Sequence, residues 1–250
     1  LVLEDGTIFP GISFGKQNTV YGEVVFTTSM TGYQEMLTDP SFAGQIVVLT
    51  YPMVGNYGIN ATDNESEKIQ VSGFVVRQHA TSPSHWSMSS SLNQFLESKN
   101  IAGLSEVDTR ALTKHLRSKG VMMGAIAIGI HPSIAIKRLK AAPRYGTTNI
   151  VESVSTKKIS AWKSNKKQTM ARVIIIDYGA KYNILRLLSQ SGLEVISVPH
   201  NTTSSEILDL NPDGIVLSPG PGDPKTLTSA PKLLAKLVYD FPVLGICLGH

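Results

Sequence analysis

The single cysteine of this sequence, Cys247, lies between two glycines in the segment GICLGH, directly after an apolar run. This G-x-nucleophile-x-G layout is typical of a nucleophile elbow, a tight turn that joins a strand to a helix. A helix that begins at the thiol would favour the thiolate. The N–H of Leu248 would point at the oxygen of any carbonyl group that the sulfur attacks. The pattern therefore indicates nucleophilic chemistry on a carbonyl carbon.

A second segment, SPGPGDP at 218–224, could supply another part of such a site. Its prolines and glycines give a rigid, open backbone in which a glycine N–H can serve as a second oxyanion donor. Two structural interpretations compete with this chemical one. A lone cysteine is usually a small buried hydrophobe, and a Gly/Pro loop is usually only a turn. Phosphate binding is a weaker alternative, since neither GxGxxG nor GxxxxGK(S/T) occurs. Both features at the ends of successive strands favour the chemical interpretation.

The elements that must position both segments form a regular series in the second half of the chain. Continuous apolar runs predict strands buried on both faces of a sheet. Their alternation with helices predicts right-handed crossovers and an α/β fold with a doubly wound parallel sheet. Ligands bind such sheets at the carboxyl ends of the strands, where both segments lie. The predicted strands are 172–177, 194–199, 213–218 and 242–246, and the predicted helices lie near 180–190, 203–210 and 229–239.

The first half of the chain is less regular and predicts an irregular mixed α/β domain. A type I′ hairpin turn is expected at Asp5-Gly6. We assign 1–145 to this domain, 146–170 to a basic linker, and 171–250 to the first, incomplete part of the doubly wound domain. The strands expected in the first half are 22–29, 45–52 and 122–130, and the helices are 89–98, 108–119 and 132–142.

Composition limits the classes of function. Hydrophobic residues make up 42% of the chain and charged residues 17%, as in a globular protein. No apolar run approaches the roughly 20 residues that span a bilayer. No secretory signal is visible at the start, and one cysteine cannot form an internal disulfide. We therefore expect a cytoplasmic protein that has no membrane contact and no metal site.

The net charge of +4 comes from a local excess of basic residues. Between Glu152 and Asp177 the chain has no acidic residue, and Trp162 is the only aromatic residue there. Nucleic-acid binding would need aromatic side chains interleaved with the basic ones. A solvated linker is the better interpretation, and we expect no nucleic-acid partner. The basic residues are Lys157, Lys158, Lys163, Lys166, Lys167 and Arg172.

The segments LSPGPGDP and GICLGH resemble the oxyanion-loop and nucleophile motifs of class I glutamine amidotransferases, whose sheet is flavodoxin-like. These two motifs do not distinguish the members of that class. The first half does, because four segments resemble the N-terminal domain of the carbamoyl-phosphate synthase small chain. They are VLEDGT, GEVVFTTSMTGYQEMLTDPSF, LTYPMVGN and VDTRALTKHLRSKG.

The resemblance implies a glutaminase that feeds a synthetase. Cys247 matches the nucleophile that forms a glutamyl thioester. Gly220, Gly222 and Leu248 match positions that contact glutamine through backbone groups, and Ser41 matches a serine that the N-terminal domain extends to the substrate.

The resemblance also implies a partner. Ammonia would pass through a tunnel to a large chain, in a heterodimer or a higher oligomer. The large chain would bind ATP with Mg. It would make carbamoyl phosphate from the ammonia, bicarbonate and two ATP, for pyrimidine or arginine biosynthesis or both. This chain itself would bind no cofactor.

A cysteine amidase also needs a histidine base and a carboxylate that orients the histidine. In the family that the chain resembles, both follow the nucleophile at a distance, which implies positions beyond residue 250. The six histidines present offer no convincing substitute. We therefore expect 1–250 to be an inactive fragment. Two alternatives stay open: a different cysteine hydrolase on a similar sheet, and a degenerate, non-catalytic module that binds a synthetase.

Overall fold

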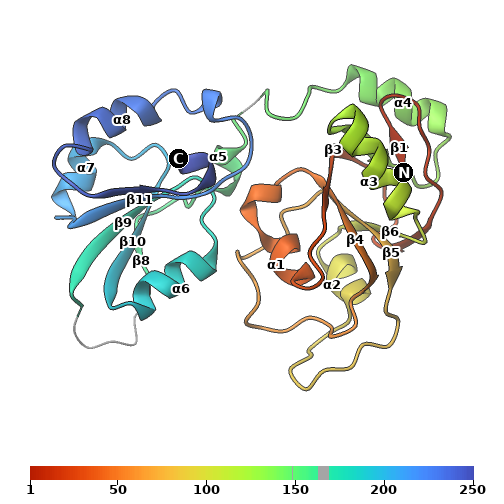
Figure 1. Ribbon diagram of the computed structural model, residues 1–250, viewed down its shortest axis with the longest axis horizontal. Coiled ribbons are helices and arrows are strands. Elements are labelled where there is room, and N and C mark those ends of the chain that lie inside the picture. Colours follow the sequence, from red (N-terminus) through yellow and green to blue (C-terminus); the bar gives the residue numbers. More distant parts are fainter. Residues whose placement is uncertain (148, 163–168) are drawn as a thin grey trace. The chain divides into compact units, whose positions relative to one another are not determined.

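The computed structural model describes residues 1–147, 149–162 and 169–250. Over these ranges the chain folds into two compact units, Leu1–Tyr145 and Gly146–His250. Each unit has a sheet of its own (Figure 1). Within the described ranges, none of the helices has the length and the apolar character that crossing a membrane requires.

A seven-stranded mixed sheet forms the centre of the first unit. Its strands are β1 (Val2–Leu3), β2 (Ile12–Gly15), β3 (Val20–Thr27), β4 (Ile46–Val54), β5 (Gly73–His79), β6 (Ala102–Ser105) and β7 (Met122–Ile126). Their order across the sheet is β1-β7-β3-β4-β5-β6-β2. Strands β3 to β6 are parallel neighbours, and antiparallel pairs add the other three strands at the two sides. The carboxyl ends of β3, β4 and β5 therefore meet at one edge of the sheet.

Helices cover both faces of this first sheet. They are α1 (Tyr33–Thr38), α2 (Leu92–Ser98), α3 (Thr109–Lys119) and α4 (Pro132–Ala141). Helix α3 packs on one face through Leu112 and Leu116, and α1 and α2 pack on the other. The predicted N-cap of α3 is confirmed, because the Asp108 carboxylate accepts a hydrogen bond from the Ala111 N–H at 2.9 Å.

The predicted type I′ turn at Asp5-Gly6 is wrong. Such a turn needs positive φ at both central residues, and Gly6 has a φ of 91° whereas Asp5 is not left-handed. The Gly6 N–H donates to Leu3 O at 3.0 Å, and the Leu3 N–H donates to Thr7 O at 2.9 Å. The Asp5 carboxylate accepts from the Thr7 N–H, which stabilises this longer turn. The glycine therefore follows the turn instead of forming its centre.

The second unit contains a five-stranded sheet. Its strands are β8 (Ser160–Ala161), β9 (Ala171–Asp177), β10 (Leu193–Pro199), β11 (Gly214–Leu217) and β12 (Val243–Gly245). The order across the sheet is β12-β11-β9-β10-β8. The four strands predicted from apolar runs are parallel, and their order matches the start of a flavodoxin-like sheet. The predicted α/β fold class is thus confirmed.

Helices lie on both faces of this second sheet as well. They are α5 (Val151–Val154), α6 (Tyr182–Gln190), α7 (Ser204–Asp209) and α8 (Ala230–Leu237). Side chains of a strand alternate between faces, so Ile174 and Ile176 join the core beneath α7 and α8. Ile175 packs with Leu185 of α6 on the opposite face. Burial on both faces explains why the centre of β9, 173–176, is a continuous apolar run.

The described part of the predicted linker 146–170 belongs to the second unit. It contains α5 and the edge strand β8, whose Ala161 pairs antiparallel with Ile196 of β10. Trp162 packs beside Tyr182 of α6. A two-residue strand held by backbone bonds leaves no periodic pattern in the sequence, so the prediction missed it. Of the predicted basic residues, Lys163, Lys166 and Lys167 lie outside the described residues.

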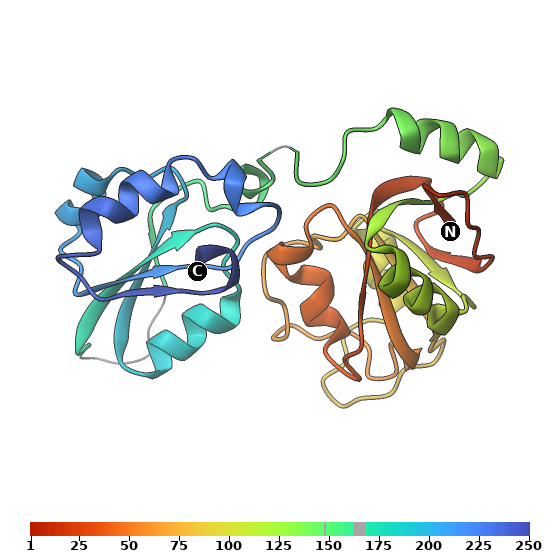
Figure 2. The same ribbon diagram turned by 45° about the horizontal axis from the view of Figure 1, so that its top comes forward.

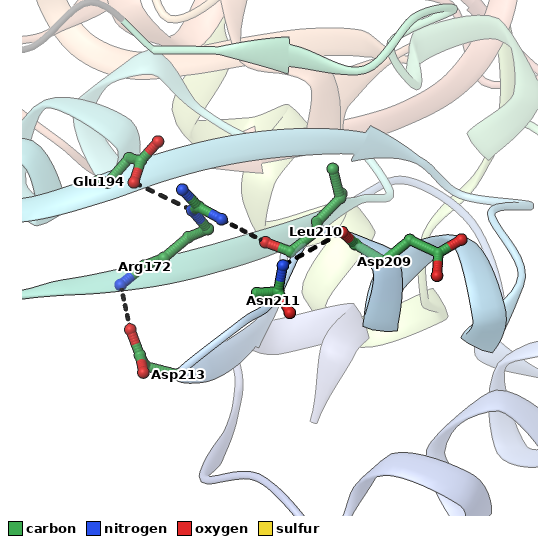
Figure 3. A network of polar contacts seen from close by, with 6 residues as sticks. All are labelled: Arg172, Glu194, Asp209, Leu210, Asn211 and Asp213. Atoms are coloured by element: carbon green, nitrogen blue, oxygen red, sulfur yellow. Dashed lines mark hydrogen bonds and ion pairs between the residues drawn. The ribbon is translucent and has the colours of Figure 1, made fainter.

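A polar network joins the amino ends of three strands of the second sheet (Figure 3). The Arg172 guanidinium donates to the Glu194 carboxylate at 3.0 Å and to Leu210 O at 2.6 Å. The Arg172 N–H donates to the Asp213 carboxylate at 2.7 Å. This network lies at the edge opposite the two segments predicted to carry chemistry. Arg172 therefore stabilises the sheet away from the candidate site.

Candidate active site

The second sheet has one edge at which its four parallel strands end, which we call the carboxyl edge. Three of the connections that leave there follow β9, β11 and β12, which are neighbours in the sheet. The strand order reverses between β9 and β11, because β10 lies on one side of β9 and β11 on the other. Ligands of open parallel sheets bind at such a switch point. The candidate site is therefore at the carboxyl edge.

Cys247 occupies a tight turn directly after β12. Its φ is 53°, a left-handed conformation that costs a residue with a side chain roughly 1–2 kcal/mol. The Gly249 N–H donates to Ile246 O at 3.0 Å, and the His250 N–H donates to Cys247 O at 2.9 Å. These bonds close a single 3-10 turn, and the cysteine is exposed. The thiol thus stands on a strained turn, as in a nucleophile elbow.

The glycines on both sides of this turn have no room for a side chain. A Cβ at Gly245 would lie 2.5 Å from Gly249 O, and a Cβ at Gly249 would lie 2.6 Å from the Leu217 Cβ. Real Cβ atoms essentially never make contacts under 3.0 Å. The Ile246 N–H also donates to Leu217 O at 3.0 Å. The turn is therefore packed tightly against the end of β11.

The SPGPGDP loop is fixed at its start by Ser218, which is completely buried. The Ser218 hydroxyl accepts a hydrogen bond from the Tyr178 N–H and donates one to Pro219 O, both at 2.8 Å. These bonds join the loop after β11 to the connection after β9. Sequence reasoning did not single out Ser218, although a polar residue that ends an apolar strand is a usable signal.

Gly220 brings this loop into contact with the nucleophile turn. A Cβ at Gly220 would collide with Tyr178 O and would lie 2.8 Å from the Leu248 Cδ2. Gly222, two residues later, has a φ of 88°. The structure therefore brings Gly220 of one connection beside Leu248, the residue that follows Cys247. These four predicted site residues all lie at the carboxyl edge of the second unit.

Asp177, at the end of β9, holds the third connection in place, and sequence reasoning missed it. Its buried carboxylate accepts hydrogen bonds from the N–H groups of Gly179 at 2.8 Å and Ala180 at 2.7 Å. A third bond comes from the Thr156 N–H at 2.7 Å. Buried polar groups need such partners. The available sequence signal was an acidic residue directly after four consecutive apolar residues, 173–176.

Tyr178 follows Asp177 and is 2% exposed. Its hydroxyl has no hydrogen-bond partner among the described residues. Burial raises the pKa of Tyr178 to about 12, so the phenol stays protonated near neutral pH. Its contacts with the site come from the backbone, because its N–H binds Ser218 and its carbonyl oxygen lies against Gly220.

Ser41, the fifth predicted site residue, lies in the first unit. It belongs to the 3-10 turn Pro40–Phe42 that follows α1, and the Ser41 N–H donates to the Asp39 carboxylate at 2.8 Å. The Gln34 side chain ties α1 to the next connection, because its amide N–H₂ donates to Asn60 O at 2.7 Å. Backbone and side-chain bonds therefore hold the Ser41 turn in one conformation.

Among the histidines that the structure describes, His200 lies directly after β10, which is another parallel strand of the second sheet. Two strands, β9 and β11, separate β10 from β12. At about 4.8 Å between neighbouring strands, the ends of β10 and β12 are roughly 14 Å apart. His200 is therefore not within hydrogen-bond reach of Cys247.

Two half-buried histidines should make stability depend on pH. Burial lowers the pKa of His79, which stacks on Phe14 at 4.3 Å, and burial is also the main cause that lowers the pKa of His200. The unfolded chain then binds more protons than the folded chain in mild acid, so the free energy of unfolding should fall as pH decreases below 6.5. Urea unfolding at several pH values above the carboxylate range would measure this slope. Glutamine substitutions at both positions should flatten it, and an unchanged slope in the double variant would contradict the assignment.

Comparison with known proteins adds a second line of argument. The family model of the carbamoyl-phosphate synthase small chain, CPSase domain, matches residues 1–126, and the model of glutamine amidotransferase class-I matches 174–250. The carbamoyl phosphate synthase small chain of Akkermansia muciniphila is 46% identical over the whole of this chain and 69% of its own length. The chain belongs to the carbamoyl phosphate synthase small chain family.

Other members of the family are similarly close. The small chain of Aquifex aeolicus is 43% identical over the whole chain and 70% of its own length. The pyrimidine-specific small chain of Halalkalibacterium halodurans is 43% identical over the whole chain and 68% of its own length.

Carbamoyl phosphate synthase small chains are glutamine amidotransferases, and this family assignment confirms the predicted resemblance. It also excludes the alternative of an unrelated cysteine hydrolase. The amidotransferase match contains the carboxyl edge with Cys247, whereas the match specific to small chains ends at Ile126, the last residue of β7. The family name implies a large-chain partner.

Proposed function

We propose that the small chain to which these 250 residues belong hydrolyses the side-chain amide of glutamine through a covalent thioester on Cys247. The sulfur attacks the amide carbon, the C–S bond forms, and a tetrahedral oxyanion results. The C–N bond then breaks, and the leaving nitrogen takes up the proton that the thiol gave to the expected histidine base, so that it departs as ammonia. Water attacks the thioester next, which releases glutamate and returns the thiol.

The backbone around Cys247 would stabilise the oxyanion. The bonds that close the nucleophile turn come from Gly249 and His250, so the Leu248 N–H is not needed to hold the turn and can donate to the substrate oxygen. A glycine N–H of the neighbouring loop, at Gly220 or Gly222, would supply a second donor. Ser41 of the first unit would contact the same glutamine molecule.

We also propose that the ammonia passes through a tunnel to the large chain. Ammonia released into neutral water would be protonated and would lose the lone pair that makes it a nucleophile. The large chain would bind ATP and Mg and make carbamoyl phosphate from bicarbonate and two ATP, for pyrimidine or arginine biosynthesis. The small chain would bind no cofactor.

The observation that carries this proposal is the conformation of Cys247. A cysteine with a φ of 53° stands between two glycines that admit no side chain, at the ligand-binding edge of a parallel sheet. A structural cysteine would have no need of backbone strain, and strained backbone conformations are typical of functional sites.

A chloroketone analogue of glutamine tests the proposal directly. We expect it to alkylate Cys247 in the full-length small chain, and we expect added glutamine to slow the alkylation at least tenfold. Peptide mass spectrometry would locate the label. Iodoacetamide, which does not resemble glutamine, would measure the reactivity of the thiol independently of glutamine binding. Equal rates with and without glutamine would mean that Cys247 is a reactive surface thiol outside any glutamine site.

A further inference from the structure

The hydroxyl of Ser218 has two hydrogen bonds, and they constrain more than the start of the SPGPGDP loop. The side chain is completely buried directly after β11. Its hydroxyl accepts from the Tyr178 N–H and donates to Pro219 O, both at 2.8 Å. A serine hydroxyl has a single proton to donate, and here that proton is given to the Pro219 carbonyl group. Ser218 therefore restrains the direction in which this carbonyl oxygen points.

The Pro219 carbonyl group belongs to the same peptide unit as the Gly220 N–H. A peptide unit is planar, and in its trans form the C=O and the N–H point in opposite directions. All peptide bonds of the described residues are trans. The Gly220 N–H consequently points away from the Ser218 hydroxyl. A bond that holds the carbonyl oxygen in place thus also sets the direction of this N–H donor.

Few rotations are left that could turn this peptide unit. The ring of Pro219 fixes the φ angle of that residue, so the ψ angle of Pro219 is the rotation that remains, and the Ser218 bond restrains it. Gly220 also packs so closely against Tyr178 O that a Cβ would collide with it. The N–H of the same tyrosine binds the Ser218 hydroxyl. The Ser218 side chain and the Tyr178 backbone therefore hold the peptide unit together.

The Gly220 N–H is a donor that lacks an acceptor. Gly220 is buried, and none of the hydrogen bonds among the described residues involves its N–H. Buried backbone N–H groups are nearly always paired, so an orphaned one at the ligand-binding edge of a sheet indicates that a ligand brings the acceptor. The neighbouring Leu248 N–H likewise takes no part in the bonds that close the nucleophile turn. Figures 1 and 2 show this turn in dark blue at the C-terminus, at the carboxyl edge of the second sheet.

We propose that Ser218 is a positioning residue for glutamine hydrolysis: through the Pro219–Gly220 peptide unit, its hydroxyl aims the Gly220 N–H at the substrate oxygen that becomes the oxyanion. The inference rests on the proposed function and deepens it, because it names the group that orients the second oxyanion donor. Donors that are fixed before the substrate arrives need no rearrangement as charge develops, which makes them effective. Ser218 itself would contact no substrate atom, since it is completely buried.

Ser218→Ala tests this role in the full-length small chain bound to its large chain. Loss of one oxyanion donor costs about 10²–10³ in kcat, and a misaimed donor loses part of that, so kcat for glutamate release should fall at least tenfold. KM for glutamine should change little, because the interaction is made mainly in the transition state. Alkylation of Cys247 by the chloroketone analogue should keep nearly its native rate and its protection by glutamine. In that reaction the sulfur displaces chloride from carbon, so no oxyanion forms.

Three further variants control for a loss of stability. Ser105→Ala is the matched control, because Ser105 is 4% exposed and its hydroxyl donates to Ile12 O at 3.0 Å in the first unit. It should lower the melting temperature and leave kcat at its native value. Ser218→Thr keeps the hydroxyl and should retain most of kcat. Ser218→Cys carries the same test if the alanine variant does not fold, because its thiol fills the site but donates only weakly.

The two readouts separate this inference from the proposed function. A loss of kcat with alkylation preserved supports the positioning role of Ser218. Equal losses of kcat and of alkylation in Ser218→Ala would mean that the serine only maintains the fold, and native kcat would mean that the Gly220 N–H needs no such restraint. Either result would overturn the inference while the native chain is still alkylated at Cys247. Absence of glutamine-protected alkylation in the native chain would instead overturn the proposed function, and the inference with it.

Discussion

Replacement of Cys247 by serine is expected to lower glutamine-dependent carbamoyl phosphate synthesis by several orders of magnitude in the complex of small and large chains. Serine keeps the size and shape of the side chain, but its hydroxyl stays protonated where a thiol can ionise. Loss of the nucleophile in covalent hydrolases costs up to about 10⁶ in kcat. Steady-state synthesis with glutamine as nitrogen donor measures the effect.

Synthesis from added ammonia is the internal control for this variant. It bypasses the thiol, so we expect it to be unchanged, and glutamine should still bind because its proposed contacts are mostly backbone groups. Arg172→Met, at the opposite edge of the sheet (Figure 3), is a matched structural control. It should cost about 1 kcal/mol of stability and leave both activities intact. Loss of both activities in Cys247→Ser would mean that the cysteine is structural, and retention of both would remove the thiol from the mechanism.

Gly220→Ala should produce the second largest effect. The new Cβ would lie 2.8 Å from the Leu248 Cδ2 and closer still to Tyr178 O. A backbone oxygen cannot rotate away as a side chain can, so the loop must move. Displacement of a site by about 1 Å can cost 100-fold in rate, and overpacking costs about 1–3 kcal/mol of stability. Measurements of kcat/KM for glutamine and of urea unfolding should show both losses.

Two other glycines provide graded controls for Gly220→Ala. A Cβ at Gly214 would lie 3.6 Å from Pro242 O, an ordinary contact, so Gly214→Ala should be tolerated. Gly222 has open space but a φ of 88°, so Gly222→Ala should cost about 1–2 kcal/mol through backbone strain alone. If Gly220→Ala kept the native kcat/KM for glutamine, the loop would not form part of the glutamine site.

Much of the second unit could be predicted because burial on both faces leaves a strong sequence pattern. The centre of β9, 173–176, is apolar throughout, and the centres of β10 and β11 are mostly apolar. Parallel pairing then fixes which loops share an edge. The neighbourhood of Cys247 and the SPGPGDP loop followed from that rule, before any contact was known.

Other features depend on tertiary contacts that no local pattern encodes. Strand β2 is only four residues long and is exposed at its first position, so it lacks both length and apolar character. The roles of Asp177 and Ser218 arise from bonds to the N–H groups of other connections. Ser41 is an ordinary turn residue in its own sequence context, and only the resemblance to a family singled it out.

The left-handed backbone of Cys247 lowers the stability of the folded chain. Glycine adopts a φ of 53° without penalty, so a chain selected for stability alone would carry glycine at this position. The cysteine instead retains a conformational cost of roughly 1–2 kcal/mol. Selection for stability and selection for activity therefore oppose each other at this residue. This cost is what the nucleophilic role that we propose for Cys247 would explain.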